Sequence, residues 1–574
     1  MIVYRESERV LATAEALQDV LRPLHSLGEG GAADHAAATD ALIGFGAVEA
    51  ALADAAAPEA DGFSPVALAA RESGLAVARL FRASARATPF APLARAACLA
   101  LEALARLPLP RTLGLRVPEG FAYYALYPEA YLDAAAGFAR EHRPGRCIVV
   151  GLRSIGTALS AVVAAELEAA GAAIESLTLR PRGAPFARRP VLEPGLADRL
   201  RHRRDAWFLI VDEGPGLSGS SFTGTAELLI GLGVPEARIA LFPSWLPDGR
   251  AFVSERAREI WPRLRKFHVP FEALRHGREL MRGARDLSGG LWRALVCPDG
   301  ARWPAAQPQH ERRKYLHEPG PAAPNPVLLK FAGLGRYGAA KRDFAERLAA
   351  GGFAPPVLGL EHGFMKTAFV PGRPLGRRDL GGALVATAAR YVAFRRMNSP
   401  VVEKLRLDEL LGLVENNVRW GLGADWLDRL GRLDVTPLFR DVPAVAVDAR
   451  MLPHEWIRAE SDFLKTDGVD HFDDHFFPGP QDIAWDVAGF AVEFGLDSRA
   501  ADEFAGAIGA ALRDPSLPAR LPFLTLAYVA TRLGYASLAA SSLGATPDGR
   551  RQAKLTKRYA WQLRRAVLAW EAGV

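Results

Sequence analysis

The strongest constraint on this chain's fold is the apolar run Trp207–Val211, which ends in two adjacent carboxylates, Asp212 and Glu213. A loop rich in glycine and serine follows, and then a helical pattern over residues 222–232. A short apolar run bounded by turn residues is typical of a buried parallel strand. Carboxylates at a strand tip suit the hydroxyls of a sugar, while amides and hydroxyls at a helix start suit a phosphate. The segment therefore predicts both halves of a ribose 5-phosphate site.

Neighbouring segments repeat the strand–loop–helix pattern. Residues 146–150 read as a second buried strand, which runs into a glycine loop at 151–156 and a helix to about residue 170. A strand over 174–179 leads into a loop, residues 180–189, that contains four arginines, and another strand covers 238–242. This order predicts a parallel α/β sheet with ligands at the carboxyl ends of its strands.

Together these segments resemble the core of type I phosphoribosyltransferases, which bind phosphoribosyl diphosphate (PRPP). Asp212 and Glu213 match the family's catalytic acidic pair, although the 214–217 spacer is slightly longer than usual. The resemblance implies a cis peptide at Leu152–Arg153, Mg²⁺, and transfer between PRPP and a nitrogenous base or similar small molecule. The PRPP-binding residues that it implies are Gly151, Arg153, Ser154, Gly156, Arg180, Arg182, Ser218, Gly219, Ser220 and Ser221. Glycine-rich turns also occur in every doubly wound fold, which is the plainer interpretation.

The length and composition of the chain limit the number of domains and the kinds of partner that it can have. A chain of 574 residues predicts two to four domains, and its net charge of +6 suits anionic small substrates. No aromatic-basic pattern is present, so nucleic acid is not expected as a partner. The three cysteines have no metal-binding spacing, and neither a signal peptide nor an apolar run of about 18 residues is visible. We therefore expect a cytoplasmic protein that does not enter a membrane.

Four segments follow from the pattern. Residues 1–115 are predicted to be helical, as a cap or a dimerisation element that is compatible with a homo-oligomer. Residues 116–260 hold the phosphoribosyltransferase-like core, and 261–326 read as an extension and linker that ends in a proline-rich boundary. Residues 327–574 form a second domain. The predicted fold class is α/β: a parallel-sheet core with an N-terminal helical region, plus a C-terminal α+β domain.

The second domain opens with a short apolar strand that carries Lys330, followed by a helix to about residue 348 and a strand pair over 353–370. Further on, Asp448 ends one predicted strand and Asp467 ends another. A helix start with Asp482 and Asp486 follows. Carboxylate oxygens at these positions suit Mg²⁺ and phosphate.

This pattern resembles aminoglycoside-phosphotransferase-like kinases. The resemblance implies that Lys330 binds the phosphates of ATP, Glu346 orients that lysine, Asp448 is the catalytic base and Asp467 holds Mg²⁺. Asp482 and Asp486 would be structural. The family's histidine-glycine-aspartate triplet is absent, and His454 or Glu455 stands where the metal-binding asparagine is expected, so His454 is a second candidate metal ligand.

Several functions remain open at this point. The leading hypothesis is a phosphoribosyltransferase joined to a small-molecule kinase. The first alternative is a regulatory protein that binds PRPP or a nucleotide through a degenerate kinase-like domain, without turnover. A second is the reverse reaction, which would release a base or sugar phosphate. The dense set Asp467, Asp470, His471, Asp473, Asp474 and His475 could instead hold a transition metal or form a polar surface turn.

Overall fold

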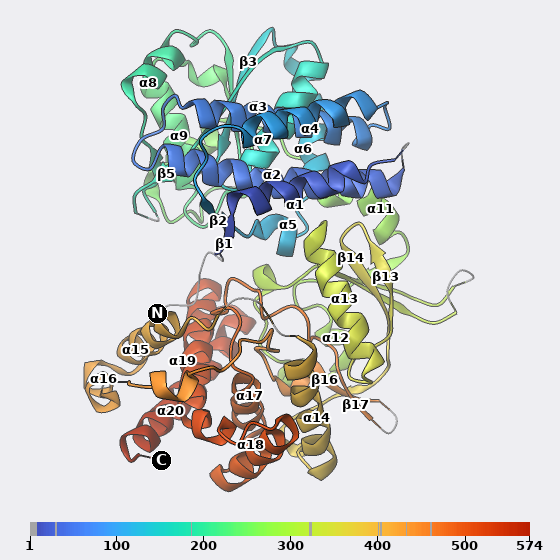
Figure 1. Ribbon diagram of the computed structural model, residues 1–574, viewed down its shortest axis with the longest axis vertical. Helices are drawn as coiled ribbons and strands as arrows, with labels where there is room; N and C mark the ends of the chain where they lie inside the picture. Colours follow the sequence, from blue (N-terminus) through green and yellow to red (C-terminus); the bar gives the residue numbers. More distant parts are fainter. Residues whose placement is uncertain are drawn as a thin grey trace. The chain divides into compact units, whose positions relative to one another are not determined.

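The computed structural model describes residues 8–28, 31–184, 186–320, 324–399, 401, 404–431, 433–459 and 462–573. These residues form two compact units. The N-terminal unit comprises Glu8–Arg282 and Gly333–Tyr337, and the C-terminal unit comprises Gly283–Ala332 and the chain from Gly338 onward. In Figure 1 the first unit runs from blue to green and the second from yellow-green to red.

A five-stranded, wholly parallel sheet forms the centre of the N-terminal unit, which confirms the predicted parallel α/β sheet. Cys147 pairs with Trp207, and Phe208 pairs with Ile239. All of the side chains of β7 are buried, as its continuous apolar run predicts. The strand order is β4 (Ala173–Leu179), β3 (Arg146–Leu152), β7 (Trp207–Val211), β8 (Ile239–Phe242) and β9 (Arg265–Lys266).

Helices accompany these strands. α7 (Gly156–Ala169) follows β3, and α9 (Ser220–Gly231) follows β7. A short hairpin, β5 (Pro181–Arg182) with β6 (Arg189–Pro190), occupies the arginine-rich loop. The other helices are α5 (Glu119–Tyr123), α6 (Pro128–His142), α8 (Pro194–Arg201), α10 (Glu255–Ile260) and α11 (Arg275–Met281).

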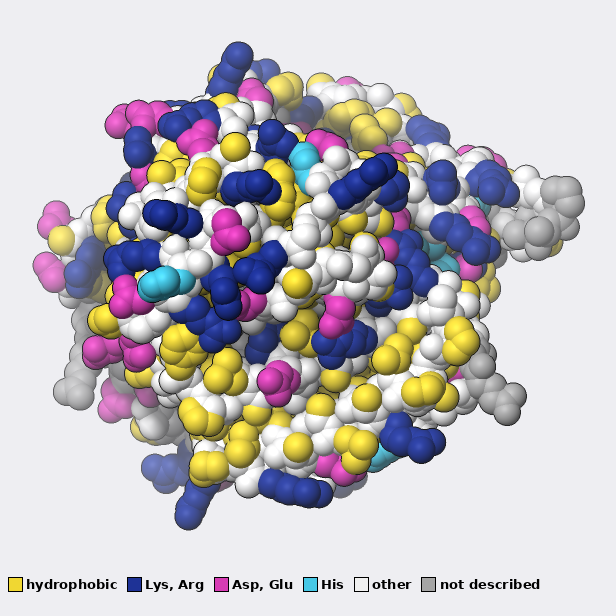
Figure 2. Space-filling model, turned by 90° about the horizontal axis from the view of Figure 1, so that it is seen from above, with side chains coloured by type: hydrophobic (Ala, Val, Ile, Leu, Met, Phe, Trp, Pro, Cys, Tyr) yellow, Lys and Arg dark blue, Asp and Glu magenta, His cyan; other side chains and the backbone are white. Residues whose placement is uncertain are grey.

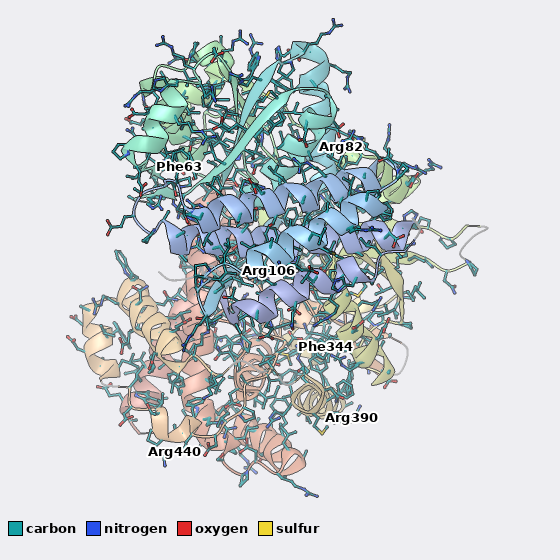
Figure 3. The ribbon with its side chains drawn as sticks, turned by 45° about the horizontal axis from the view of Figure 1, so that its top comes forward. Phe63, Arg82, Arg106, Phe344, Arg390 and Arg440 are labelled. Carbon is teal, nitrogen blue, oxygen red and sulfur yellow. The ribbon has the colours of Figure 1, made fainter. Side chains whose placement is uncertain are left out.

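The described residues between 13 and 105 are mostly helical, as predicted, whereas two short strands flank them within the segment 1–115. The helices are α1 (Thr13–His25), α2 (Ala32–Ala56), α3 (Pro65–Ala85) and α4 (Ala91–Ala105), and the strands are the antiparallel pair β1 (Glu8–Ala12) and β2 (Thr112–Arg116). α2 and α3 pack on α7. Arg82 of α3, labelled in Figure 3, pairs with Glu166 of α7 at 2.7 Å. α2 is long and apolar enough to span a bilayer, but 67% of its most apolar window is buried, as in a core helix.

An antiparallel sheet opens the C-terminal unit. Its order is β10 (Ala284–Asp286), β11 (Lys314–His317), β12 (Val327–Phe331), β14 (Phe364–Ala368) and β13 (Val357–Glu361). Because β10 and β11 belong to this sheet, residues 283–320 are not the linker expected for 261–326. Residues 261–282 contribute β9 and α11 to the N-terminal unit. The unit boundary therefore lies near residue 282 rather than at 260 and 326.

The rest of the C-terminal unit is mostly helical. A small sheet, β15 (Arg373–Pro374), β16 (Trp456–Ala459) and β17 (Asp462–Lys465), carries the segments expected to bear the site. Trp456, Trp485 and Tyr528 are fully buried in a core between it and the helices. The helices are α12 (Arg293–Val296), α13 (Arg336–Ala350), α14 (Gly382–Asn398), α15 (Leu407–Leu422), α16 (Ala424–Leu430), α17 (Ala484–Phe494), α18 (Ser498–Leu512), α19 (Leu517–Leu543) and α20 (Pro547–Glu571).

Acidic and basic side chains are mixed on the face drawn in Figure 2, where no continuous basic stripe is visible.

Candidate functional site

A cavity of about 360 Å³ lies within the C-terminal unit. Its apolar lining residues, termed the apolar wall, come largely from strands of both sheets and from the segment after β14. Many of its polar lining residues, termed the polar wall, come from residues 450–474. Residues of the apolar wall include Leu328, Met365, Ala368, Val370 and Ile457. A pocket that combines an apolar wall with a few convergent polar groups is typical of small-molecule sites.

Lys330, the fourth of the five residues of β12, reaches this cavity from an otherwise apolar strand. Its Nζ lies 2.5 Å from Asp467 Oδ1 and also pairs with Asp470. Burial by itself would lower the pKa of Lys330, but these two carboxylates raise it above its usual value. The ammonium group is therefore positively charged at neutral pH.

Glu346 does not orient Lys330, contrary to the expectation from sequence. Its side chain is 54% exposed and lies 3.6 Å from Arg342 on the outer face of α13. The same helix buries Lys341, whose Nζ lies 3.7 Å from Asp470 and 3.6 Å from Asp473. The carboxylates that pair with Lys330 are therefore those of Asp467 and Asp470, not that of Glu346.

Asp448 also differs from its predicted role. It is 1% exposed and does not line the cavity, because its carboxylate accepts a hydrogen bond from the Tyr391 hydroxyl at 2.5 Å and pairs with Lys465 at 3.2 Å. A carboxylate held in this way cannot take a proton from an acceptor in the cavity.

Asp486 explains how this loop is held. Its two carboxylate oxygens accept the backbone N–H groups of Asp448 at 2.7 Å and Ala449 at 3.1 Å. Asp482 accepts a hydrogen bond from buried Arg520 at 2.5 Å. Both contacts fit the structural role that the sequence resemblance implied for these aspartates.

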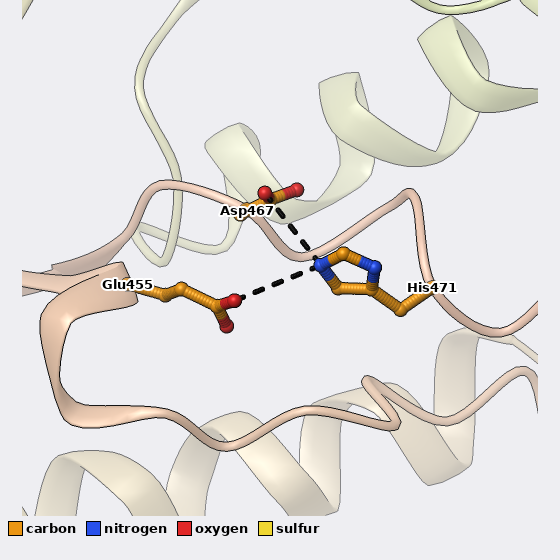
Figure 4. Close-up of side chains that lie close together, drawn as sticks. All are labelled: Glu455, Asp467 and His471. Atoms are coloured by element: carbon orange, nitrogen blue, oxygen red, sulfur yellow. Dashed lines mark ion pairs between the residues drawn. The ribbon is translucent and has the colours of Figure 1, made fainter. Parts of the chain in front are cut away.

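Three side chains converge on the polar wall: Glu455, Asp467 and His471, shown in Figure 4. His471 Nε2 lies 3.7 Å from Glu455 Oε1 and 3.6 Å from Asp467 Oδ2. Lys465 lowers the pKa of Glu455 to about 2 despite burial, which favours the neutral acid. Burial and Arg450 lower the pKa of His471, but Asp467 and Glu455 raise it overall.

His454 is not part of this group. Its ring stacks on Trp292, with centroids 5.9 Å apart and planes inclined by 16°. The sequence singled out His454 because it lies near the expected asparagine position, and it placed His471 only within a larger polar cluster. The neighbour Glu455 and the more distant His471 are the residues that the fold brings to Asp467.

The cavity lining also includes arginines that lie over a tyrosine ring. Arg450 and Arg532 lie over the ring of Tyr535, with guanidinium carbons 4.9 Å and 5.6 Å from its centroid. Glu493 also lines the cavity and is engaged by Arg558 at 2.8 Å, by the Tyr559 hydroxyl at 2.6 Å and by Arg532 Nε at 3.9 Å. Sequence motifs gave no signal for this group, since its members come from separate helices and a loop.

In the N-terminal unit, the two predicted loops meet at the carboxyl end of the sheet. Asp212 follows β7, and its carboxylate accepts the backbone N–H of Gly156 at the start of α7. Burial raises the pKa of Asp212 to about 7, and burial together with Glu119 and Asp212 raises the pKa of Glu213 well above its usual value. Buried Tyr131 donates its hydroxyl to the Asp212 carbonyl at 2.8 Å.

The raised pKa of Asp212 predicts a pH effect. Between about pH 4 and 7 the folded chain retains a proton that the unfolded chain has lost, so stability falls as pH rises across this window and then levels off. Asp212→Asn removes this dependence. Its free energy of unfolding relative to wild type should therefore rise from pH 4 to 7, by at most about 1.4 kcal/mol per pH unit. Urea denaturation of both proteins between pH 4 and 7 measures the difference in unfolding free energy. A difference that does not change with pH would contradict the raised pKa of Asp212.

Gly156 is predicted to tolerate no side chain. A Cβ there would lie 2.5 Å from the Val211 carbonyl oxygen and 3.1 Å from Asp212 Oδ1. We expect Gly156→Ala to lower the free energy of unfolding by about 1–3 kcal/mol. Gly195→Ala is the matched control, because a Cβ in the first turn of α8 meets nothing within 4 Å. Equal urea midpoints for both variants would show that the two loops are not in close contact.

The predicted phosphate loop leads directly into α9. Gly219 has a φ of 65°, in the left-handed region that favours glycine, and the ring of Phe252 lies 2.8 Å from where its Cβ would be. Ser218 Oγ lies 2.9 Å from Ser220 Oγ. Ser220 and Ser221 form the first turn of the helix. The loop therefore places hydroxyls at a helix N-terminus, as expected.

The arginines expected on the diphosphate are paired with carboxylates of the helical region instead. Arg180 Nε lies 2.9 Å from Asp54 Oδ1, Arg182 Nη1 lies 3.1 Å from Asp61 Oδ2, and Arg153 pairs with both aspartates. A space of only about 20 Å³ is lined by Asp54, Ser154 and Arg180. Buried guanidinium groups need counter-charges, and these aspartates supply them.

The loop between β3 and α7 contains a cis peptide bond at Arg153–Ser154, one residue after the Leu152–Arg153 bond at which it was expected.

No protein-family model matches the chain, and no curated protein is similar to it in sequence.

Solved structures give weak similarities. A choline/ethanolamine kinase family protein from Mesorhizobium loti is 15% identical, with 49% of this chain and 98% of that chain covered and a TM-score of 0.31. An ethanolamine kinase from Plasmodium vivax is 9% identical, covering 60% and 95%, with a TM-score of 0.31. The GDP complex of aminoglycoside 2'-phosphotransferase-IIIa is 13% identical, covering 47% and 97%, with a TM-score of 0.31. TM-scores this low assign neither a fold nor an activity, so function must be inferred from the geometry of the site.

Proposed function

We propose that the C-terminal unit binds a nucleoside triphosphate such as ATP in its cavity and transfers the terminal phosphoryl group to a small acceptor. The observation that carries this proposal is the Lys330–Asp467 pair, both members of which line the cavity. A fixed ammonium group beside a carboxylate suits a phosphate chain and its divalent cation, respectively.

The remaining residues support the same chemistry. The apolar wall offers aliphatic side chains against which a base ring can pack, while Lys330 neutralises phosphate charge. The oxygens of Asp467 fit a hard cation, and such a cation would neutralise charge that develops on the transferring group. Phosphoryl transfer depends mainly on positioning and electrostatic stabilisation, so the burial of Asp448 does not exclude it.

The acceptor that we propose carries a negative charge. Arg450 and Arg532 line the cavity beside Tyr535. Their guanidinium groups can bind a phosphate or carboxylate, which would compete with Glu493 for Arg532. A cationic acceptor would meet like charges there.

The test is acceptor-dependent ADP formation by the full chain, with products identified by mass spectrometry. Acceptors are supplied in matched pairs with and without a phosphate, such as ribose 5-phosphate and ribose. Transfer to a phosphate-bearing acceptor is expected. If ATP binds but no acceptor is phosphorylated, the chain is the non-catalytic binding protein that its sequence left open.

A second proposed function concerns the N-terminal unit: binding of a ribose 5-phosphate group, and with it phosphoribosyl transfer from PRPP to a base. The contact between Asp212 and the start of α7, beside a serine loop at the start of α9, favours it. PRPP would have to draw Arg153, Arg180 and Arg182 from Asp54 and Asp61. Calorimetric titration with PRPP and Mg²⁺ should give saturable heat, and no heat at millimolar PRPP contradicts the proposal.

A further inference from the structure

We propose that Glu455, Asp467 and His471 form a site for a divalent transition-metal ion, and that this site gives the C-terminal unit a preference for such an ion over Mg²⁺. The role of this metal site rests on the proposed phosphotransfer function, for which it specifies the metal ion. Binding of the ion itself requires neither a nucleotide nor an acceptor, so it can be tested separately.

Each carboxylate directs one oxygen to a lysine and the other to the histidine. Lys465 Nζ contacts Glu455 Oε2 at 2.7 Å, and Lys330 Nζ contacts Asp467 Oδ1 at 2.5 Å. The remaining oxygens, Glu455 Oε1 and Asp467 Oδ2, are the ones that face His471 Nε2. The lysines thus hold two carboxylates in orientations that direct three donor atoms toward one point.

The spacing suits an ion better than direct hydrogen bonds. The distances of 3.7 Å and 3.6 Å from His471 Nε2 exceed hydrogen-bond length. Two ligands at about 2.1 Å from one tetrahedral ion lie roughly 3.4 Å apart. All three donor atoms lie within 4.8 Å of one another, so the two carboxylate oxygens need to approach each other by at most about 1.4 Å to complete a tetrahedral set.

His471 supplies a second observation. Neither of its ring nitrogens has a hydrogen-bond partner among the described residues, although both are buried. A buried polar atom without a partner is costly unless something satisfies it. Because the side chain is only 11% exposed, bulk water does not readily do so. An ion at Nε2 would satisfy that atom.

The donor types define the class of ion. Mg²⁺ prefers oxygen ligands alone, whereas imidazole nitrogen favours transition-metal ions such as Fe²⁺ or Zn²⁺, for which Mn²⁺ serves as a paramagnetic probe. Two carboxylates and one imidazole leave coordination positions open toward the cavity, where phosphate oxygens of a nucleotide could bind. The alternative occupant of the site is a proton on His471 that bridges the two carboxylates.

The experiment measures Mn²⁺ binding to the nucleotide-free full chain by the loss of the free-ion signal in electron paramagnetic resonance. We expect one Mn²⁺ per chain, bound at least tenfold more tightly than Mg²⁺ in competition. His471→Ala should weaken Mn²⁺ at least tenfold and leave Mg²⁺ affinity nearly unchanged. His362→Asn, at the exposed turn between β13 and β14, is the matched control and should bind as wild type.

A second measurement covers the case in which His471→Ala fails to fold. Wild-type protein loaded with Mn²⁺ should show nitrogen coupling from a bound imidazole in electron spin-echo spectra. Absence of Mn²⁺ binding up to about 1 mM, or bound Mn²⁺ without nitrogen coupling, overturns the inference and indicates a proton in the site. Neither result bears on ATP affinity, which is measured separately in the presence of a metal chelator. Failure of the metal site can therefore be distinguished from failure of the proposed phosphotransfer function.

Discussion

Lys330→Met is expected to weaken nucleotide binding by roughly 10- to 100-fold and to abolish measurable phosphoryl transfer. The variant removes the ammonium group that faces the phosphates, and a hydrogen bond to a charged group contributes about 1.5–3 kcal/mol. Calorimetry with ATP gives the affinity, and ADP formation gives the activity. A variant with wild-type affinity and turnover would exclude this cavity as the nucleotide site.

Two further variants make this result specific. Lys366→Met lies on the adjacent strand β14, where Lys366 is 35% exposed and pairs with Glu361, so it should bind ATP normally. Lys330→Arg retains the charge that Asp467 and Asp470 need. Lys330→Arg should therefore stay folded, even if Lys330→Met is destabilised because Asp467 and Asp470 lose their counter-charge. The guanidinium group of the arginine is larger than an ammonium group, so Lys330→Arg should still impair phosphoryl transfer.

Asp486→Ala is expected to cause the largest loss of stability, about 3–5 kcal/mol of unfolding free energy. It leaves two buried backbone N–H groups, those of Asp448 and Ala449, without their acceptor, and buried Arg395 loses a carboxylate 3.7 Å away. Urea denaturation followed by circular dichroism measures the change.

The control for this variant is Asp497→Ala. Asp497 caps the exposed start of α18 through the N–H of Ala500 at 2.8 Å, and loss of such a cap costs about 1 kcal/mol. If both variants lose the same small amount, Asp486 does not hold the loop that carries Asp448.

The elements that could be predicted from sequence are those with local signals. β3 and β7 could be predicted because a fully buried strand is a continuous apolar run. The helices that follow them, α7 and α9, could be predicted because a glycine-containing loop precedes each one. Lys330 stood out as the one charge in an apolar strand. In each case the information lies within a few residues.

The side-chain partners could not be predicted, because they join distant segments. Arg180 and Asp54 are 126 residues apart, and Arg182 and Asp61 are 121 apart, so no local pattern relates them. Glu346 was misplaced for a different reason. α13 buries Lys341, Phe344, Ala345 and Leu348, and the helical period places residue 346 on the opposite face. His454 was misplaced because proximity in sequence to the expected position does not fix the direction of a side chain.

The most direct measurement is covalent labelling of the full chain with an ATP acyl phosphate, which transfers its acyl group to lysines beside the bound phosphates, followed by peptide mass spectrometry. We expect acylation of Lys330 or Lys465, which line the cavity, and its suppression by excess ATP. Labelling confined to exposed lysines such as Lys366, without protection by ATP, would contradict the account of the C-terminal cavity as a nucleotide site.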